Sequence, residues 1–539
     1  MRTKVCILAV LMASAFANSQ ILAKEPLAKS LDAAALQGEP EIKNLASPLC
    51  DDQTFLRRIT LDVIGRTPTS TEVRDFLASK EADKRLKAVD RLLSSPDFSW
   101  YWAQVLDSWW MERRQGKNVE VAAWMAYLRE SLASDKPIDT VITEIVSADG
   151  VDPAQRAKAR FLLDRDMEPT LVVRDISRLF LGANLQCSQC HDHPRVEAYK
   201  QEHFHGLMAY FNRTYLFDDP KLKKKVIGEK ADGEVTFQSV FDPKKVTKKR
   251  SPGLPGGAEK TDPMVSKDQL YVSAPTKEVR GVPKYSRRLL LGKDLAEAGR
   301  RPMARNLANR LWAQLNGKGL VHPLDQIHPD NPADNEPLLE SLTDLVIDSR
   351  FSLKPVIRQV MLSNAYQRSS VSKHQLKDAE KRLLIARLRP LSPEQMGYAV
   401  LSSTGFDEAE IKALGAKATP VALHAKREGA AKPFVGMLAQ PAGNPYSFEP
   451  RLEQSLFMSN HAQTMALLVA RPGNLASRLM EAKGADAMAD ELYLSMFCRF
   501  PDSQERTEIA AALQSGDKAS VISDLIWALL TSAEFRFIS

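Results

Sequence analysis

Apolar residues recur at helical spacing along most of the chain, with polar residues between them. A spacing of three or four residues places side chains on one face of a helix, where they can be buried together. Such stripes are formed by Leu86, Val89, Leu92 and Leu93, by Leu171, Val172, Ile176, Leu179 and Phe180, and by Leu307, Leu311 and Leu315. The pattern therefore predicts a mostly α-helical protein.

Residues that begin or end helices flank several of these stripes. Thr69 and Glu72 have the spacing of a capping box, which predicts a helix from Ser70 to about Ser79. Ser392-Pro393-Glu394-Gln395 is a second such start. Pro169 is placed to begin a helix that Gly182 ends, and a helix from Pro302 to Leu315 is followed by Gly317. Four of the seven tryptophans lie between Trp100 and Met111, a cluster typical of a core.

The helical pattern stops between about residues 216 and 285. This segment is rich in lysine and then in proline and glycine, and Val235, Phe237 and Ser239 alternate with other residues after an Asp232-Gly233 turn, which predicts a β-hairpin. We therefore expect two helical domains joined by a basic, Pro/Gly-rich linker with a small β-hairpin insertion. The expected ranges are a signal peptide 1–17, a polar segment 18–47, a first helical domain 48–215, the linker 216–285 and a second helical domain 286–539.

Composition and charge narrow the class of protein. The 539 residues are 44% hydrophobic and 26% charged, which excludes a collagen-like, wholly disordered or polytopic membrane protein. The net charge is 74 − 67 = +7, and residues 221–250 alone hold ten Lys or Arg against four Asp or Glu. A basic surface spread along the fold, as nucleic-acid binding requires, is not indicated.

The beginning of the chain has the pattern of a signal peptide. Arg2 and Lys4 precede an apolar run from Val5 to Ala17, which is too short to cross a bilayer as a helix. We expect cleavage after Ala17, no transmembrane anchor in the mature protein, and export to the periplasm or the extracellular space.

The most informative motif is Cys187-Ser188-Gln189-Cys190-His191. Cys-x-x-Cys-His is the attachment signature of c-type haem, in which two thiols bond to the porphyrin and the following histidine ligates iron. Such haem is attached outside the cytoplasm, the compartment that the signal peptide indicates. The predicted cofactor is therefore haem c, bound by Cys187 and Cys190 with His191 as an axial ligand.

The second axial ligand is left open by the sequence. His203, His205 and Met208 follow on a predicted helix, together with Tyr199, Phe204 and Phe211. A methionine ligand raises the reduction potential of a haem and a histidine ligand lowers it. An open site would instead bind small molecules.

The same residues permit two other readings. Zinc could be held by Cys187 and Cys190 with one histidine from each of the pairs His191/His193 and His203/His205. The protein would then be a secreted binding or scaffold protein for a surface polysaccharide or a protein partner. Alternatively, Cys187 and Cys190 could form a disulfide. For the distant Cys50 and Cys498, the sequence leaves open a disulfide or two free, buried thiols.

Other motifs say little about activity. Neither a Gly-x-Ser-x-Gly elbow nor a His-Glu-x-x-His sequence occurs, so no hydrolase is indicated and an enzymatic activity is left open. Several polar residues share a predicted helix in the second domain, where a network between helices is favoured over a ligand pocket. They are Arg301, Arg305, Asn306, Asn309 and Arg310.

Several long motifs together carry a family resemblance. In the first half they are residues 52–58, 61–68 and 180–182, then Cys187 to Pro194 and residues 207–211. In the second half they are 301–302, 309–312, 319–323, 363–367, 491–494, 524–530 and 532–535. With these, the chain resembles the planctomycete secreted cytochrome-type family. That resemblance implies a cytochrome-like domain of unknown function followed by a second domain of unknown function, and a c-type haem with a redox partner that the sequence does not identify.

Overall fold

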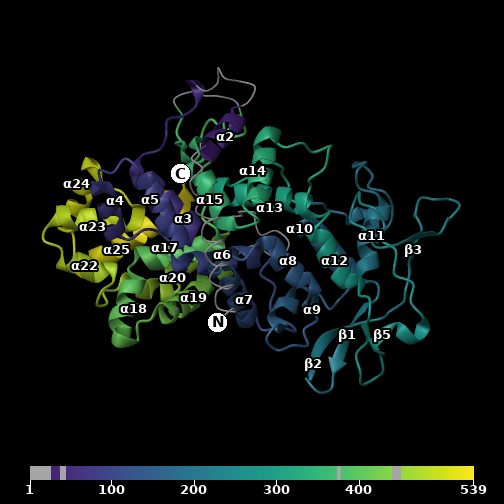
Figure 1. Ribbon diagram of the computed structural model, residues 1–539. Coiled ribbons are helices and arrows are strands. Elements are labelled where there is room, and N and C mark those ends of the chain that lie inside the picture. Colours follow the sequence, from purple (N-terminus) through teal and green to yellow (C-terminus); the bar gives the residue numbers. More distant parts are fainter. Residues whose placement is uncertain (1–25, 37–43, 373–377, 440–450) are drawn as a thin grey trace, which may run out of the picture. The chain divides into compact units, whose positions relative to one another are not determined.

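The computed structural model describes residues 26–36, 44–372, 378–439 and 451–539 (Figure 1). The predicted signal peptide, residues 1–17, lies outside the described residues. Most described residues are helical, and the strands form four antiparallel two-stranded sheets within this part of the chain. The expected mostly α fold with a small β-hairpin is therefore confirmed.

The described residues divide into two compact units that interleave along the chain. The first unit is drawn from Met1–Pro40 and Trp109–Val360, and the second from Glu41–Ser108 and Met361–Ser539. The sequence-based ranges 48–215 and 286–539 follow the chain in consecutive blocks, and the compact units do not follow these blocks. Caps and stripes are local signals, whereas the units are defined by contacts between distant segments.

The first unit contains the predicted site. Its α13 (Arg300–Asn316) packs against α14 (Glu336–Asp348), α10 (Pro169–Phe180) and α12 (Arg287–Ala296). The other helices are α2 (Pro26–Ala35), α7 (Val121–Ala133), α8 (Ile138–Ser147), α9 (Arg160–Leu163) and α11 (Gln201–Phe211), with the last turn of α6 (Pro96–Trp110) and most of α15 (Leu353–Leu362).

Three small sheets of the first unit lie in the segment that was expected as a linker. β1 (Thr214–Asp219) pairs with β2 (Lys224–Glu229), and β5 (Tyr271–Ser273) pairs with β6 (Val282–Pro283). The expected hairpin strand is β3 (Val235–Phe237), and its partner β4 (Lys248–Arg250) follows a long loop. The Asp232-Gly233 turn precedes β3 and does not join it to its partner.

Among the described residues of the second unit, β7 (Arg389–Pro390) and β8 (Phe537–Ile538) form one short sheet, and the other regular elements are helices. Its helices are α3 (Asp52–Ile64), α4 (Ser70–Ala78), α5 (Lys84–Ser94), most of α6, α16 (Asn364–Gln367), α17 (Pro393–Ser403), α18 (Phe406–Leu414), α19 (Pro420–Leu438), α20 (Leu452–Asn460), α21 (Ala462–Leu468), α22 (Leu475–Glu481), α23 (Ala485–Phe497), α24 (Ser503–Ala512), α25 (Lys518–Thr531) and α26 (Ala533–Arg536).

A buried carboxylate ties distant parts of the second unit together. Asp62 on α3 is almost completely buried and forms an ion pair with Arg389, with 2.5 Å between Oδ2 and NH2. The Tyr366 hydroxyl donates to the same carboxylate at 2.6 Å, and Gln395 on α17 donates to the Leu61 carbonyl at 3.0 Å. These bonds explain why α3 belongs to the unit formed mostly by the C-terminal half.

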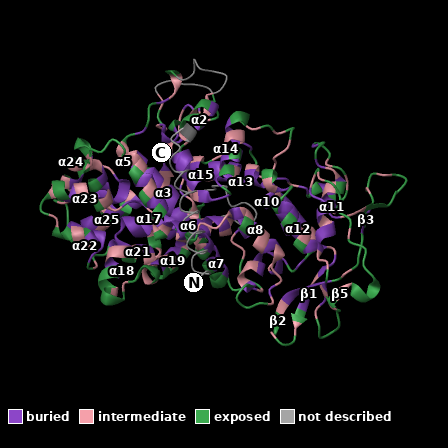
Figure 2. Cartoon of the chain, in the orientation of Figure 1, coloured by how far each residue is buried: buried purple, intermediate pink, exposed green. Residues whose placement is uncertain are grey.

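Predicted helix ends are confirmed in both units, although α13 begins at Arg300, two residues before the predicted start at Pro302. The Thr69–Glu72 and Ser392–Gln395 capping boxes are formed, and Gly317 ends α13 in the left-handed conformation. Trp102, Trp109 and Trp110 are buried, as expected for a core cluster. Figure 2 shows buried residues along the helices of both units. Helices α3 and α17 are buried on nearly all sides rather than on one face.

Among the helices of the described segments, none combines the length and the apolar character needed to cross a membrane.

Candidate functional site: the Cys187–Met208 segment

Helix α10 leads directly into the Cys/His motif, and both of its ends are fixed. Pro169 occupies the first turn, and the Glu168 carboxylate accepts hydrogen bonds from the backbone N–H groups of Thr170 at 3.2 Å and Leu171 at 2.6 Å. Gly182 follows the helix with φ of +70°, and a Cβ there would lie 2.6 Å from Ile327 Cδ1. The turn toward the cysteines therefore requires glycine.

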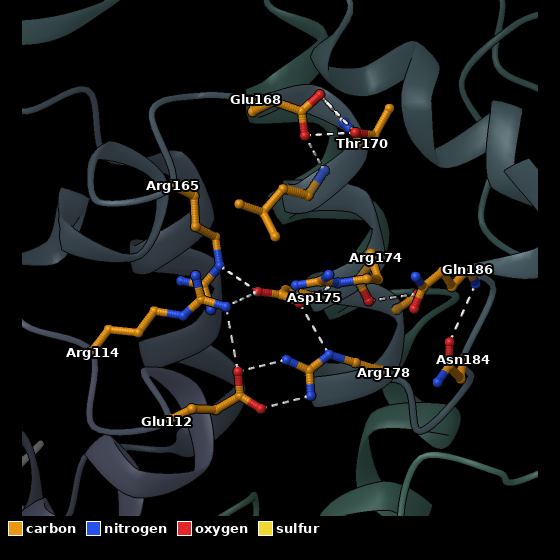
Figure 3. A network of polar contacts seen from close by, with 12 residues as sticks. Glu112, Arg114, Arg165, Glu168, Thr170, Arg174, Asp175, Arg178, Asn184 and Gln186 are labelled. Carbon is orange, nitrogen blue, oxygen red and sulfur yellow. Dashed lines mark hydrogen bonds and ion pairs between the residues drawn. The ribbon is translucent and has the colours of Figure 1, made fainter. Parts of the chain in front are cut away.

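A buried ion network holds α10 in place (Figure 3). Asp175 is fully buried and accepts from Arg165 Nε at 2.7 Å and from Arg178 Nε at 3.0 Å. Arg178 also donates to both oxygens of the buried Glu112, at 2.9 and 2.7 Å. Burial alone would raise the pKa of Asp175, but Arg165 and Arg178 lower it to about 2, so this carboxylate is charged.

The polar residues of α13 form a second network, as the sequence favoured. Asn306 donates to the Leu179 carbonyl at 2.7 Å, and Arg310 donates to the Arg178 carbonyl at 3.1 Å, so α13 binds the C-terminal end of α10. Asn309 exchanges two hydrogen bonds of 2.9 Å with the backbone of Val321. Arg301 and Arg305 form ion pairs with acidic residues of α14.

Backbone pairing fixes the segment between α10 and the cysteines. The Ile327 N–H donates to the Gly182 carbonyl and the Asn184 N–H donates to the Asp325 carbonyl, both at 2.9 Å. The Tyr199 hydroxyl reaches the Ile327 carbonyl at 3.2 Å from the other side of the motif. The motif therefore begins and ends on a common backbone support, residues 325–327.

The two cysteines lie on one tight turn. Residues Cys187–Gln189 form a 3₁₀ helix, and the Cys190 N–H points to the Cys187 carbonyl at 3.4 Å. The buried Ser188 hydroxyl between them donates to the Tyr199 carbonyl at 3.2 Å, which holds the turn against the start of α11. Residues three apart on such a turn project from the same side.

Both thiols of the motif are exposed and unbonded. Neither a Cys187–Cys190 nor a Cys50–Cys498 disulfide is present, and Cys50 and Cys498 are free and buried. Burial raises the pKa of Cys50 and raises the pKa of Cys498 to about 12, so those two thiols stay protonated and unreactive. The exposed pair is chemically the available one.

The bonding of His191 defines which of its ring nitrogens can act as a ligand. Its Nδ1 lies 2.6 Å from the Asp192 carbonyl oxygen. A carbonyl oxygen only accepts, so Nδ1 carries the proton and the neutral ring keeps its lone pair on Nε2. This arrangement, in which the second nitrogen donates to a backbone carbonyl, is the usual one for a metal-bound histidine.

His193 and His203 are bonded differently. Nδ1 of His193 accepts from the Val196 and Arg195 N–H groups at 2.9 and 3.2 Å, which places the proton of the neutral ring on Nε2. Nδ1 of His203 accepts from the Lys200 N–H at 3.3 Å, and the ring also interacts with the Ala198 backbone. Burial lowers the pKa of both residues. Both rings therefore accept hydrogen bonds from nearby backbone N–H groups, which uses their Nδ1 lone pairs.

His205 and Met208 are three residues apart on α11 and share a side of that helix. His205 Nε2 lies 3.2 Å from the Gln189 carbonyl, so its lone pair is on Nδ1, which is buried without a hydrogen-bond partner. Its ring stacks on Phe237 with centroids 4.2 Å apart, and burial lowers its pKa. Met208 is half-buried. Of the expected second ligands, these two keep an unused donor atom.

The four zinc ligands that the sequence allowed are not gathered at one point. Within the described segments, which include all of residues 187–208, no three His, Cys, Asp or Glu side chains are placed to hold a metal ion together.

Two residues that contact the Cys/His motif were not predicted as part of the site from the sequence. The Val240 N–H donates to the Cys190 carbonyl at 3.1 Å, and the Phe241 ring lies 4.7 Å from the His191 ring. An exposed phenylalanine in a lysine-rich stretch was the available signal, but the register of the distant β3–β4 pairing was needed to place it.

A cavity of about 640 Å³ lies elsewhere in the first unit, between α7 and the turn at residues 153–158. At its wall Tyr127, Lys136 and Lys158 surround Glu144, with contacts of 2.7, 3.0 and 3.1 Å. None of the predicted site residues lines it.

Two protein families match the chain, one in each half of the sequence. Residues 31–215 match PSCyt2, described as a protein of unknown function (DUF1549), and residues 287–432 match PSD1, described as a protein of unknown function (DUF1553). The chain joins a PSCyt2 domain to a PSD1 domain. This is the order that the resemblance implied. The Cys/His motif lies within the PSCyt2 match, and the polar network of α13 lies within the PSD1 match.

No curated protein and no solved structure matches the chain.

Proposed function

We propose that the protein binds one haem c covalently outside the cytoplasm and acts in electron transfer or redox chemistry. Cys187 and Cys190 would be the thioether anchors and His191 the axial ligand. The observation that carries the proposal is the tautomer of His191, which leaves Nε2 free directly beside two exposed, unbonded thiols.

The residues present fit such a group. Each thiol adds across a vinyl double bond, with sulfur bonded to one carbon and hydrogen to the other, so attachment consumes no oxidant. Cys187, Gln189 and Cys190 are exposed, so a bulky group attached there has space. When bound, the haem would supply a one-electron redox centre.

The chain's own part would be to fix and tune that centre. The Asp192 carbonyl would orient His191 and increase its basicity through the Nδ1 hydrogen bond. Met208 or His205 would be the candidate second ligand. The α10 ion network and residues 325–327 would hold the motif in place through its flanking backbone.

The test is a visible spectrum and a haem stain of a denaturing gel, on protein made with residues 1–17 in a host competent for cytochrome c maturation. We expect a sharp reduced α-band and a stain that survives denaturation, both lost in Cys187→Ala/Cys190→Ala. A His191→Gln change should shift the spectrum, whereas His193→Asn, which keeps an acceptor for the backbone N–H groups, should not.

A colourless protein would overturn the proposal. One equivalent of zinc in elemental analysis of that protein would instead support the metal-stabilised binding protein.

A further inference from the structure

The loop between β3 and β4, residues 238–247, exposes apolar side chains beside the Cys/His motif. Val240 is 66% exposed and Phe241 is 74% exposed, and Val246 farther along the loop is 50% exposed. The loop is drawn mostly as exposed in Figure 2. Exposed apolar groups that gather in one place indicate a surface that is covered in the working protein.

This loop is fastened to the motif. Besides the Val240–Cys190 hydrogen bond, the Gln201 side-chain amide donates to the Gln238 carbonyl at 3.0 Å and lies 3.4 Å from the Gln189 carbonyl. Asp242 accepts from the Lys244 and Val246 N–H groups at 2.9 and 3.1 Å, which closes the turn from within. The exposure of Phe241 is therefore a feature of an ordered loop.

The charge of the same loop selects the occupant. Lys244 and Lys245 in the loop, and Lys248 at the start of β4, are exposed. A haem combines a flat apolar ring with two carboxylate side chains at one edge. An apolar surface bordered by ammonium groups, beside two free thiols, matches that combination.

We propose that the β3–β4 loop forms one wall of the haem site. Val240 and Phe241 would supply apolar contact surface for the haem, and the lysines would supply positive charge to balance its carboxylates. Phe241 would also be a positioning residue, because its ring limits how far the His191 imidazole can turn. This inference rests on the proposed function.

The test compares a Val240→Ser/Phe241→Ser variant with a Val272→Ser control. Val272 on β5 is 73% exposed, so its loss changes exposed apolar surface in the same insertion without touching the motif. In the matured protein we expect the covalent haem stain to persist in the loop variant, while its reduction potential falls because the haem is more exposed to water. The Val272→Ser protein should keep the wild-type potential.

A second measurement does not depend on maturation. Free haem is titrated into the Cys187→Ser/Cys190→Ser chain with and without the two loop substitutions. Loss of the apolar wall should weaken binding about tenfold, and Val272→Ser should leave it unchanged.

The outcomes separate the two proposals. Suppose that the wild-type protein stains for haem and the loop variant keeps both the reduction potential and the haem affinity. The proposal that the loop forms a wall of the haem site would then be wrong, and the proposed function would stand. Wild-type protein without covalent haem would overturn the proposed function itself.

Discussion

Asp175 on α10 and His191 in the segment after α10 are centres of two polar clusters in the same unit, and they use their hydrogen-bonding groups very differently. Around Asp175, each carboxylate oxygen accepts hydrogen bonds from arginine side chains. Arg165 also donates to the Phe161 and Trp110 carbonyls, at 2.9 Å each. Around His191, the two thiols are unbonded, and the nearby Nδ1 of His205 has no hydrogen-bond partner.

This difference distinguishes a cluster that stabilises the fold from a cluster that can bind a ligand. A buried carboxylate is tolerated when its counter-charges are in place, and ion pairs of this kind hold the helices that carry them in one arrangement. The unbonded thiols of Cys187 and Cys190 are exposed and therefore available to a ligand. The Asp175 cluster therefore acts as the structural support, and the His191 cluster holds the groups available for binding.

The largest expected effect is on the support. Asp175→Asn leaves Arg165 buried without its counter-charge, so we expect the free energy of unfolding to fall by about 3–5 kcal/mol. Urea denaturation followed by tryptophan fluorescence measures this, since Trp109 and Trp110 lie close by in the first unit. Asp166→Asn is the matched control, because Asp166 pairs with Lys117 at the surface and should cost no more than about 1 kcal/mol. Equal losses of unfolding free energy in the two variants would show that Asp175 is no more important for stability than a surface ion pair.

Acid should weaken the same network. The pKa of Asp175 is lowered from 3.8 to about 2, so its contribution is fully present above about pH 4 and is lost as the pH falls through 2. Over that window the stability difference between wild type and Asp175→Asn should shrink by about 2 kcal/mol. Urea titrations at a series of pH values give this difference, and other carboxylates cancel because both proteins carry them. A difference that does not change with pH would show that Asp175 is not held charged by its arginines.

Much of the local structure could be predicted from the sequence. The Thr69 and Ser392 caps, the start of α10 at Pro169 and the end of α13 at Gly317 are set by residues within one turn of each other, so their signals are short-range. The Cys187–His191 motif and the α13 network were also visible, because spacing alone reveals them.

What the sequence did not predict depends on distant pairing. The partner of β3 begins only after a ten-residue loop, and Asp62 meets Arg389 from the opposite half of the chain. Which nitrogen of each histidine is used depends on backbone carbonyls and N–H groups, whose positions a sequence pattern does not specify. For that reason the sequence left His191 and His193, and likewise His203 and His205, as interchangeable zinc ligands, although their bonding differs.

The smallest expected change in stability is at the thiols. Cys187→Ser/Cys190→Ser alters exposed groups without internal bonds, so we expect the free energy of unfolding to stay within about 0.5 kcal/mol of wild type. Reaction with a thiol reagent near pH 8 should nevertheless change sharply. Protein without haem should show two more fast-reacting thiols than this variant, and the difference cancels any contribution from Cys6. Cys50 and Cys498 should react only after denaturation, because they are buried and their pKa values are raised. Fast reaction of Cys498 in the folded variant would contradict the contrast between a closed core and an exposed site. The core would then expose a reactive thiol as readily as the proposed site does.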